Sequence, residues 1–147
     1  MITIRDLLSV KGRDVYAVHP GTTVIETLKY LAEKDIGALV VLKNDGIAGI
    51  ISERDFVRSI AETGKCLLES TVSDYMTEEV FTIEVDQSLS DCMKLMTAKH
   101  IRHVPVVEKG KLVGVISIGD VVKAIITDHE MTIDQLSNYI EGRGYGH

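Results

Sequence analysis

The spacing of apolar residues along the chain predicts the same order of secondary structure twice. Apolar residues recur every three or four positions in two stretches, which is typical of helices that bury one stripe. These stretches carry Val24, Leu28 and Leu31 in the first half and Leu89, Met93 and Met96 in the second. In the first half, two nearly continuous apolar runs follow, residues 38–42 and 47–51, joined by a polar turn. This pattern recurs in the second half and predicts a β-hairpin that is covered on both faces.

The two halves are copies of one unit. Residues 49–55 (Gly-Ile-Ile-Ser-Glu-Arg-Asp) and 114–120 (Gly-Val-Ile-Ser-Ile-Gly-Asp) share a glycine, a serine and an aspartate at the same spacing. An offset of 65 residues aligns 15–60 with 80–125 without a gap. In each copy we therefore predict a short strand (residues 15–18 and 80–83), a helix that starts at Thr23 or Ser88, a hairpin and a second helix, which in the first copy stops near Gly64.

Two similar segments, residues 3–8 and 71–76, lead into the two copies. We therefore expect a first repeat over residues 3–64 and a second over 71–126. A helical extension over 127–142 is expected to follow the second repeat.

The shared pattern Gly-h-h-Ser-x-x-Asp (h, apolar; x, any residue) places Ser52 and Ser117 where a strand meets a helix. Free backbone N–H groups at a helix N-terminus favour anions, so a phosphate there would meet several donors and a hydroxyl. Asp55 and Asp120, one turn further on, could accept hydrogen bonds from a ribose. Ser-x-x-Asp is also a helix capping box, so each copy could simply start a helix. Both interpretations remain open at this point.

Composition narrows the classes of function. Hydrophobic residues make up 45% of the chain and charged residues 26%, which is typical of a folded globular protein. The net charge of −6, without a basic run, argues against nucleic acid or a membrane surface as a partner. Cys66 and Cys92 stand far apart, and no apolar stretch approaches the length of a signal sequence or a membrane span. A reducing, cytoplasmic setting is therefore expected.

No set of catalytic residues stands out, so we expect a protein that is not an enzyme. His100 and His103 would suit a metal if one helix spanned both, but the helical pattern ends near Ile101 and no further ligand stands close by. Cys92 lies on the packed side of a predicted helix without an activating partner. The aspartates of the shared pattern belong to equivalent sites, which duplicated binding explains better than divided acid and base roles. No catalytic residue and no metal ligand is predicted.

The last predicted helix continues past the end of the repeat. From Gly119 the helical pattern runs to Gly142, and Ile126, Ile133 and Ile140 follow at intervals of seven residues. This apolar edge points away from the repeat core, and leaving it in water would forgo roughly 1.5–3 kcal/mol of burial per large side chain. A partner subunit is the simplest cover, so we expect a homodimer. The alternative is that the helix folds back on its own repeat.

The repeated unit resembles a pair of cystathionine-β-synthase (CBS) domains. Residues 101–107 (Ile-Arg-His-Val-Pro-Val-Val) followed by 112–117 (Leu-Val-Gly-Val-Ile-Ser) are similar to the second repeat of that family nearly throughout. The resemblance implies an α/β (α+β) fold of two β-α-β-β-α repeats packed about a pseudo-two-fold axis, with the extended C-terminal helix added. It is closest to the small stand-alone bacterial and archaeal members.

The resemblance also implies two clefts that bind adenine nucleotides, with AMP, ATP or NAD as candidate ligands and no obligatory cofactor. Carried over by position, the implied contacts are Asp55 and Asp120 for ribose hydroxyls, Ser52 and Ser117 for phosphate, Arg102 with His103 for phosphate, and Thr82 as a frequent ligand contact. The first copy departs from the pattern, because residues 37–40 (Gly-Ala-Leu-Val) replace 102–105 (Arg-His-Val-Pro). Arg54 could compensate in part. The two clefts should therefore differ in affinity or ligand.

Two functional interpretations follow, besides the disfavoured enzyme. The leading one is a regulatory module that senses adenine nucleotides through the conformation of its dimer and is read by an unknown downstream protein. The alternative is a purely structural dimerisation module that has no physiological ligand.

Overall fold

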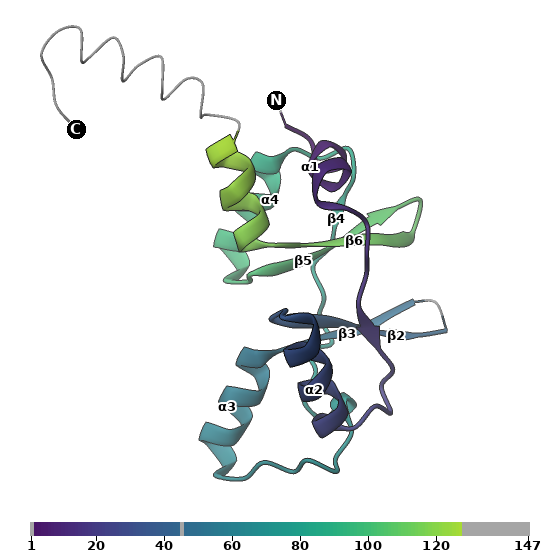
Figure 1. The fold of residues 1–147 in the computed structure, drawn as a ribbon, viewed down its shortest axis with the longest axis vertical. Helices are drawn as coiled ribbons and strands as arrows, with labels where there is room; N and C mark the ends of the chain where they lie inside the picture. The colour runs from purple at the N-terminus through teal and green to yellow at the C-terminus, as the bar shows by residue number, and fades with distance from the viewer. Residues whose placement is uncertain (1, 45, 128–147) are drawn as a thin grey trace, which may run out of the picture.

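The computed structural model describes residues 2–44 and 46–127 of the 147-residue chain, and it contains two units with the same order of elements (Figure 1). The first consists of β1 (Ala17–Val18), α2 (Val24–Lys34), β2 (Ala38–Lys43), β3 (Gly46–Ser52) and α3 (Glu53–Thr63). The second consists of β4 (Ile83–Glu84), α4 (Leu89–Lys99), β5 (His103–Glu108), β6 (Lys111–Ser117) and a helix over 118–127. The lead-in elements are α1 (Ile4–Lys11) and the short 3₁₀ helix η1 (Val72–Asp74). The predicted fold class is confirmed.

Each unit has a three-stranded sheet with the same topology. The orders are β1-β2-β3 and β4-β5-β6, with the first pair parallel and the hairpin pair antiparallel in both. β1 and β4 are shorter than the predicted strands, since each pairs with a single neighbour over two residues. The two sheets lie next to each other in the middle of the molecule, with the helices of each unit on the outer sides (Figure 1).

Hydroxyl side chains start the helices where the sequence places them. Thr23 caps α2 by accepting from the backbone N–H of Glu26, and Ser88 forms a complete capping box with Asp91 at the start of α4. α3 ends at Gly64, which has φ 72° and so adopts the left-handed conformation that glycine tolerates best. These local signals act over three or four residues, which is why the sequence predicts them well.

The two lead-in segments pack on opposite units. Ile4, Leu7 and Leu8 of α1 are buried in the core of the second unit, and the backbone N–H of Ile4 donates to the carbonyl of Gln87 at 2.9 Å. Val72 of η1 is likewise fully buried in the core of the first unit. Each unit is therefore completed by the lead-in of the other, and this exchange ties the two halves together.

The final predicted helix is only partly within the described residues. A helix is present over 118–127, whereas the predicted extension past residue 127, with Ile133 and Ile140, lies outside the described residues. Within 2–44 and 46–127, no helix is long and apolar enough to cross a bilayer.

Candidate functional site

The first Ser-x-x-Asp turn joins β3 to α3. Ser52 has an extended backbone (φ −127°, ψ 163°) and its hydroxyl accepts from the backbone N–H of Asp55 at 3.3 Å. In return, Asp55 Oδ2 accepts from the backbone N–H of Ser52 at 2.8 Å and from its hydroxyl at 3.1 Å. The capping interpretation of this turn is therefore confirmed. The cap uses one carboxylate oxygen, Oδ2, so it does not by itself exclude a ligand on the other.

The second turn joins β6 to the helix over 118–127 and has the same geometry. The backbone N–H of Ser117 donates to Asp120 Oδ2 at 2.8 Å, and the backbone N–H of Asp120 donates to Ser117 Oγ at 3.2 Å. Both turns therefore present a half-buried carboxylate beside the N-terminus of a helix. That arrangement places an acceptor for hydroxyls next to donors for an anion.

The glycine of each motif allows a lead-in segment to approach the strand. A Cβ added at Gly114 would lie 2.8 Å from Leu8 Cδ2, and one at Gly49 would lie 2.8 Å from both Met76 Sδ and the carbonyl oxygen of Thr77. Real Cβ atoms essentially never have contacts below 3.0 Å, so only glycine fits these places without a shift. The motif thus serves the exchange of lead-ins as well as the turn.

Asp55 has a neutral partner from the segment that follows η1. The hydroxyl of Thr77 donates to Asp55 Oδ1 at 3.2 Å. The backbone of Thr77 pairs with Ile50, with both N–H···O distances at 2.9 Å, and this bridge fixes its position. The lead-in of the second repeat therefore reaches the carboxylate of the first.

Asp120 has a charged partner instead. Lys11, the last residue of α1, donates from Nζ to Asp120 Oδ2 at 2.5 Å and also to the carbonyl oxygen of Val115. Burial alone would raise the pKa of the Asp120 carboxyl, but the Lys11 ammonium and the hydrogen bonds from Ser117 hold this pKa below its ordinary value. Asp120 is therefore ionised and neutralised by Lys11 at neutral pH.

Arg102 and His103 lie beside the second turn. His103 faces Ser117 across the β5–β6 pair, and the backbone N–H of Ile118 donates to the Arg102 carbonyl at 2.8 Å. Burial is the main cause that lowers the pKa of His103, and the positive charge of Lys11 acts in the same direction. The backbone of this basic pair therefore adjoins the second turn, while the His103 imidazole lies against Gly37 of the first repeat.

The small residues of the first repeat that replace the basic pair lie close to the second repeat. Gly37 and Ala38 occupy the positions that correspond to Arg102 and His103. A Cβ at Gly37 would lie 3.3 Å from Cε1 of His103, which is tighter than nine in ten real Cβ contacts. The imidazole of the second repeat thus lies against the small residue of the first, where the two units meet.

Arg54 and Thr82 are both exposed, Arg54 on the first turn of α3 and Thr82 directly before β4. Within 2–44 and 46–127, neither side chain forms a hydrogen bond or an ion pair with the other predicted site residues. The sequence missed Lys11 and Thr77, because their partners lie in the opposite repeat. The signal that could have revealed such contacts is a glycine inside a strand, which often marks the close approach of another segment.

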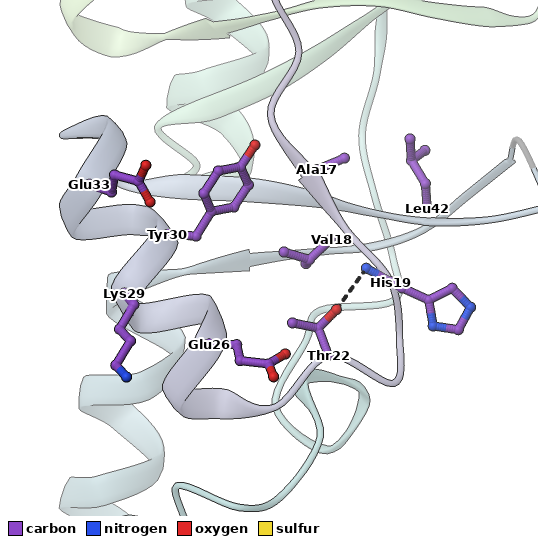
Figure 2. Close-up of a pocket in the computed structure, with 9 residues that line it drawn as sticks. All are labelled: Ala17, Val18, His19, Thr22, Glu26, Lys29, Tyr30, Glu33 and Leu42. Atoms are coloured by element: carbon purple, nitrogen blue, oxygen red, sulfur yellow. Dashed lines mark hydrogen bonds between the residues drawn. The ribbon is translucent and has the colours of Figure 1, made fainter.

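A separate open hollow of about 690 Å³ lies between α2 and the edge strand β1 (Figure 2). It is lined by Ala17, Val18, His19, Thr22, Glu26, Lys29, Tyr30, Glu33 and Leu42. The backbone N–H of His19 donates to the Thr22 hydroxyl at 3.1 Å, as the dashed line in Figure 2 shows. None of the predicted site residues lines this hollow, and its charged residues of opposite sign, Glu26, Lys29 and Glu33, lie along the face of α2.

Cys92 and His100 are two further side chains with potentially reactive or metal-binding groups. Burial raises the pKa of the Cys92 thiol to about 11, so it is a poor nucleophile at neutral pH. His100 ends α4 in the left-handed conformation (φ 55°), so one helix does not span both His100 and His103. Across the described residues, 2–44 and 46–127, no group of three or more His, Cys, Asp or Glu side chains could hold a metal ion.

Comparisons with known proteins agree with this architecture. The CBS domain family model matches residues 4–62 and 72–127. The mitochondrial CBS domain-containing protein CBSX3 of Arabidopsis thaliana is 36% identical over 152 residues, which cover 97% of this chain and 73% of that protein. The crystal structure of a CBS-domain containing protein from Agrobacterium tumefaciens is 44% identical, with a TM-score of 0.80 over 84% of this chain and 99% of that chain. The structure of CBSX2 in complex with AMP is 24% identical and shares the fold, with a TM-score of 0.71 over 86% of this chain and 98% of that chain.

Proposed function

The chain belongs to the CBS-domain family, and on this premise we propose that it is a regulatory module that binds an adenine nucleotide at its two Ser-x-x-Asp turns. The observation that carries the proposal is the duplicated turn itself. Asp55 and Asp120 each present a half-buried carboxylate next to a helix N-terminus. A carboxylate accepts hydrogen bonds from a ribose diol, and the helix N-terminus favours phosphate. AMP is bound by CBSX2, which has the same fold.

The surroundings of Asp55 and Asp120 differ in charge, which supports a different ligand preference at each turn. Arg102 and His103 lie beside Ser117, whereas the first repeat has Gly37 and Ala38 at those positions. A phosphate-rich ligand such as ATP gains more from extra cations than adenosine does. We therefore assign the more strongly anionic ligand, among AMP, ATP and NAD, to the cleft with Asp120.

A homodimer is part of the proposal. α3 and the helix over 118–127 lie on the same side of the molecule (Figure 1), and both expose apolar side chains. These are Val57, Ile60, Ile118, Val122 and Ile126. An apolar hollow of about 380 Å³ runs along the second of these helices. Exposed apolar side chains on helices at one side of a molecule are typical of an interaction site, and a second copy would cover them.

In such a dimer, nucleotide binding shifts the population of subunit arrangements and so changes the surface that a downstream protein reads. A ligand can do this only through a difference in its affinity for the two arrangements. The free thiol of exposed Cys66 favours a reducing compartment such as the cytoplasm for this regulation.

The capping boxes favour one competing function, a structural dimerisation module whose aspartates only start helices. A thermal shift assay with AMP, ATP, NAD and S-adenosylmethionine separates the two. A ligand at a hundred times its dissociation constant adds about 2.7 kcal/mol of stability to a protein that binds it only when folded. We expect at least one adenine nucleotide to raise the Tm in a concentration-dependent way. If none of the four does so at millimolar concentration, the structural module is the better account.

A further inference from the structure

Lys11 contacts the Asp120 turn of the second repeat, although in the sequence it lies before the first strand of the first repeat. By sequence it follows the first lead-in, but α1 packs in the core of the second unit, where Ile4 and Leu8 are at most 1% exposed. Arg5 of the same helix forms an ion pair with Glu108 at 2.8 Å, which further fixes α1 on that unit. The helix therefore delivers its last residue, Lys11, to the Asp120 turn with little freedom.

The bonding of Lys11 leaves capacity for a ligand. An ammonium has three N–H donors, and among the described residues two are accounted for, by Asp120 Oδ2 and the carbonyl of Val115. Its side chain is 33% exposed, so the remaining donor is accessible from solvent. Lysine also carries its charge on a flexible four-carbon stem, which allows the ammonium to shift without movement of the helix.

At the first turn, no residue among those described places a cation at the matching contact. There, the partner that the exchanged segment supplies to Asp55 is the neutral hydroxyl of Thr77. The two carboxylates thus differ by a full positive charge in their exchanged partner. This difference adds to the contrast between Arg102 and Gly37, and it arises from a residue that the repeat pattern does not contain.

We propose that Lys11 is a ligand-binding residue at the Asp120 turn and makes this site prefer nucleosides that carry a phosphate. Lys11 donates to a phosphate oxygen while Asp120 accepts from the ribose. The inference rests on the proposed function and names the group that makes one cleft specific for a phosphorylated nucleoside. A purely structural Lys11 would tie α1 to β6 without affecting that preference. A Lys11 that simply competes with the ribose for Asp120 would weaken adenosine and AMP alike.

The test is calorimetric titration of the full-length protein with AMP and with adenosine, in wild type, Lys11→Met and Lys11→Arg. Loss of a charge-assisted hydrogen bond predicts that Lys11→Met weakens AMP by about tenfold or more at one class of sites. Adenosine should change by less than about threefold, and Lys11→Arg should keep most of the preference for AMP. The ratio of the dissociation constants for AMP and adenosine is compared, because this ratio is unaffected by the fraction of protein that is folded.

Thr77→Val is the matched control, since it removes the equivalent partner of Asp55 and no charge. It should leave the AMP-to-adenosine ratio of the Lys11-dependent sites unchanged. If Lys11→Met leaves the ratio unchanged, weakens both ligands equally or tightens both, the inference is wrong while the proposed function stands. If wild-type protein binds neither ligand, the proposed function fails, and this inference falls with it.

Discussion

The close approach of the exchanged segments predicts that the motif glycines tolerate alanine poorly. At Gly49 an added Cβ would lie 2.8 Å from the carbonyl oxygen of Thr77, and that carbonyl accepts from the backbone N–H of Ile50 at 2.9 Å. A backbone atom cannot rotate away, so relief of the clash must strain or break the bridge between these two residues. At Gly114 the clash is with the side chain of Leu8, which can turn but is only 1% exposed.

The expected magnitudes follow from this difference. Overpacking of a core costs about 1–3 kcal/mol, and loss of one backbone hydrogen bond costs about 0.5–1.5 kcal/mol. Replacing a strand glycine without a clash would instead stabilise by roughly 0.5–1 kcal/mol. We therefore expect Gly49→Ala to lower the free energy of unfolding by about 2 kcal/mol, and Gly114→Ala by less.

Urea unfolding followed by circular dichroism measures these changes as shifts of the midpoint at constant slope. Gly119→Ala is the matched control, because its Cβ would meet nothing closer than Ser117 Oγ at 3.6 Å, and it should be neutral or slightly stabilising. Leu8→Ala, combined with Gly114→Ala, should cost less than the sum of the two single changes. If the costs of Leu8→Ala and Gly114→Ala add, or if Gly49→Ala leaves the free energy of unfolding unchanged, the steric role of these glycines is refuted.

Three shorter predictions concern charge and assembly. Burial lowers the pKa of His103, so as the pH falls below about 6.5 this histidine is protonated in the unfolded state before it is protonated in the folded state. The free energy of unfolding should therefore decrease with falling pH in this range, and decrease less in His103→Gln. Urea unfolding at several pH values measures this difference. Arg102→Ala should weaken ATP more than adenosine by calorimetry, and equal losses would remove Arg102 from the phosphate site. The double variant Val57→Asp with Val122→Asp should be a monomer by light scattering, and a double variant that stays dimeric contradicts the assigned face. Truncation after Thr127, measured in the same way, tests whether residues 128–147 contribute to the dimer.

The parts of the fold that depend on neighbouring residues could be predicted from the sequence. The turns at Ser52 and Ser117, the cap at Ser88 and the stop at Gly64 are each determined within one helical turn, and the structure confirms them. The repeat offset then transfers each prediction from one half to the other. Duplication thus doubled the information that was available for every local element.

The parts that depend on tertiary contacts could not be predicted. Nothing in the pattern of α1 indicates that Leu8 packs on Gly114 and not on its own repeat, because an apolar stripe fits either core equally well. The same exchange hides the bond from Lys11 to Asp120, since the two residues are 109 positions apart in the chain. Repeats with matching surfaces leave the choice of partner open at the level of sequence, and it is decided only when both units fold.

The measurement that tests the central claim most directly is AMP binding by calorimetry to wild type, to the double variant Asp55→Ala with Asp120→Ala, and to Asp91→Ala. Asp91 forms the same capping box with Ser88 at the start of α4, away from the two turns, so it controls for the loss of a helix cap. A charged hydrogen bond is worth about 1.5–3 kcal/mol, so the double variant should bind AMP roughly ten- to a hundredfold more weakly, with Asp91→Ala unchanged. Undiminished binding in the double variant would mean that both aspartates only cap helices and that the nucleotide, if bound, lies elsewhere.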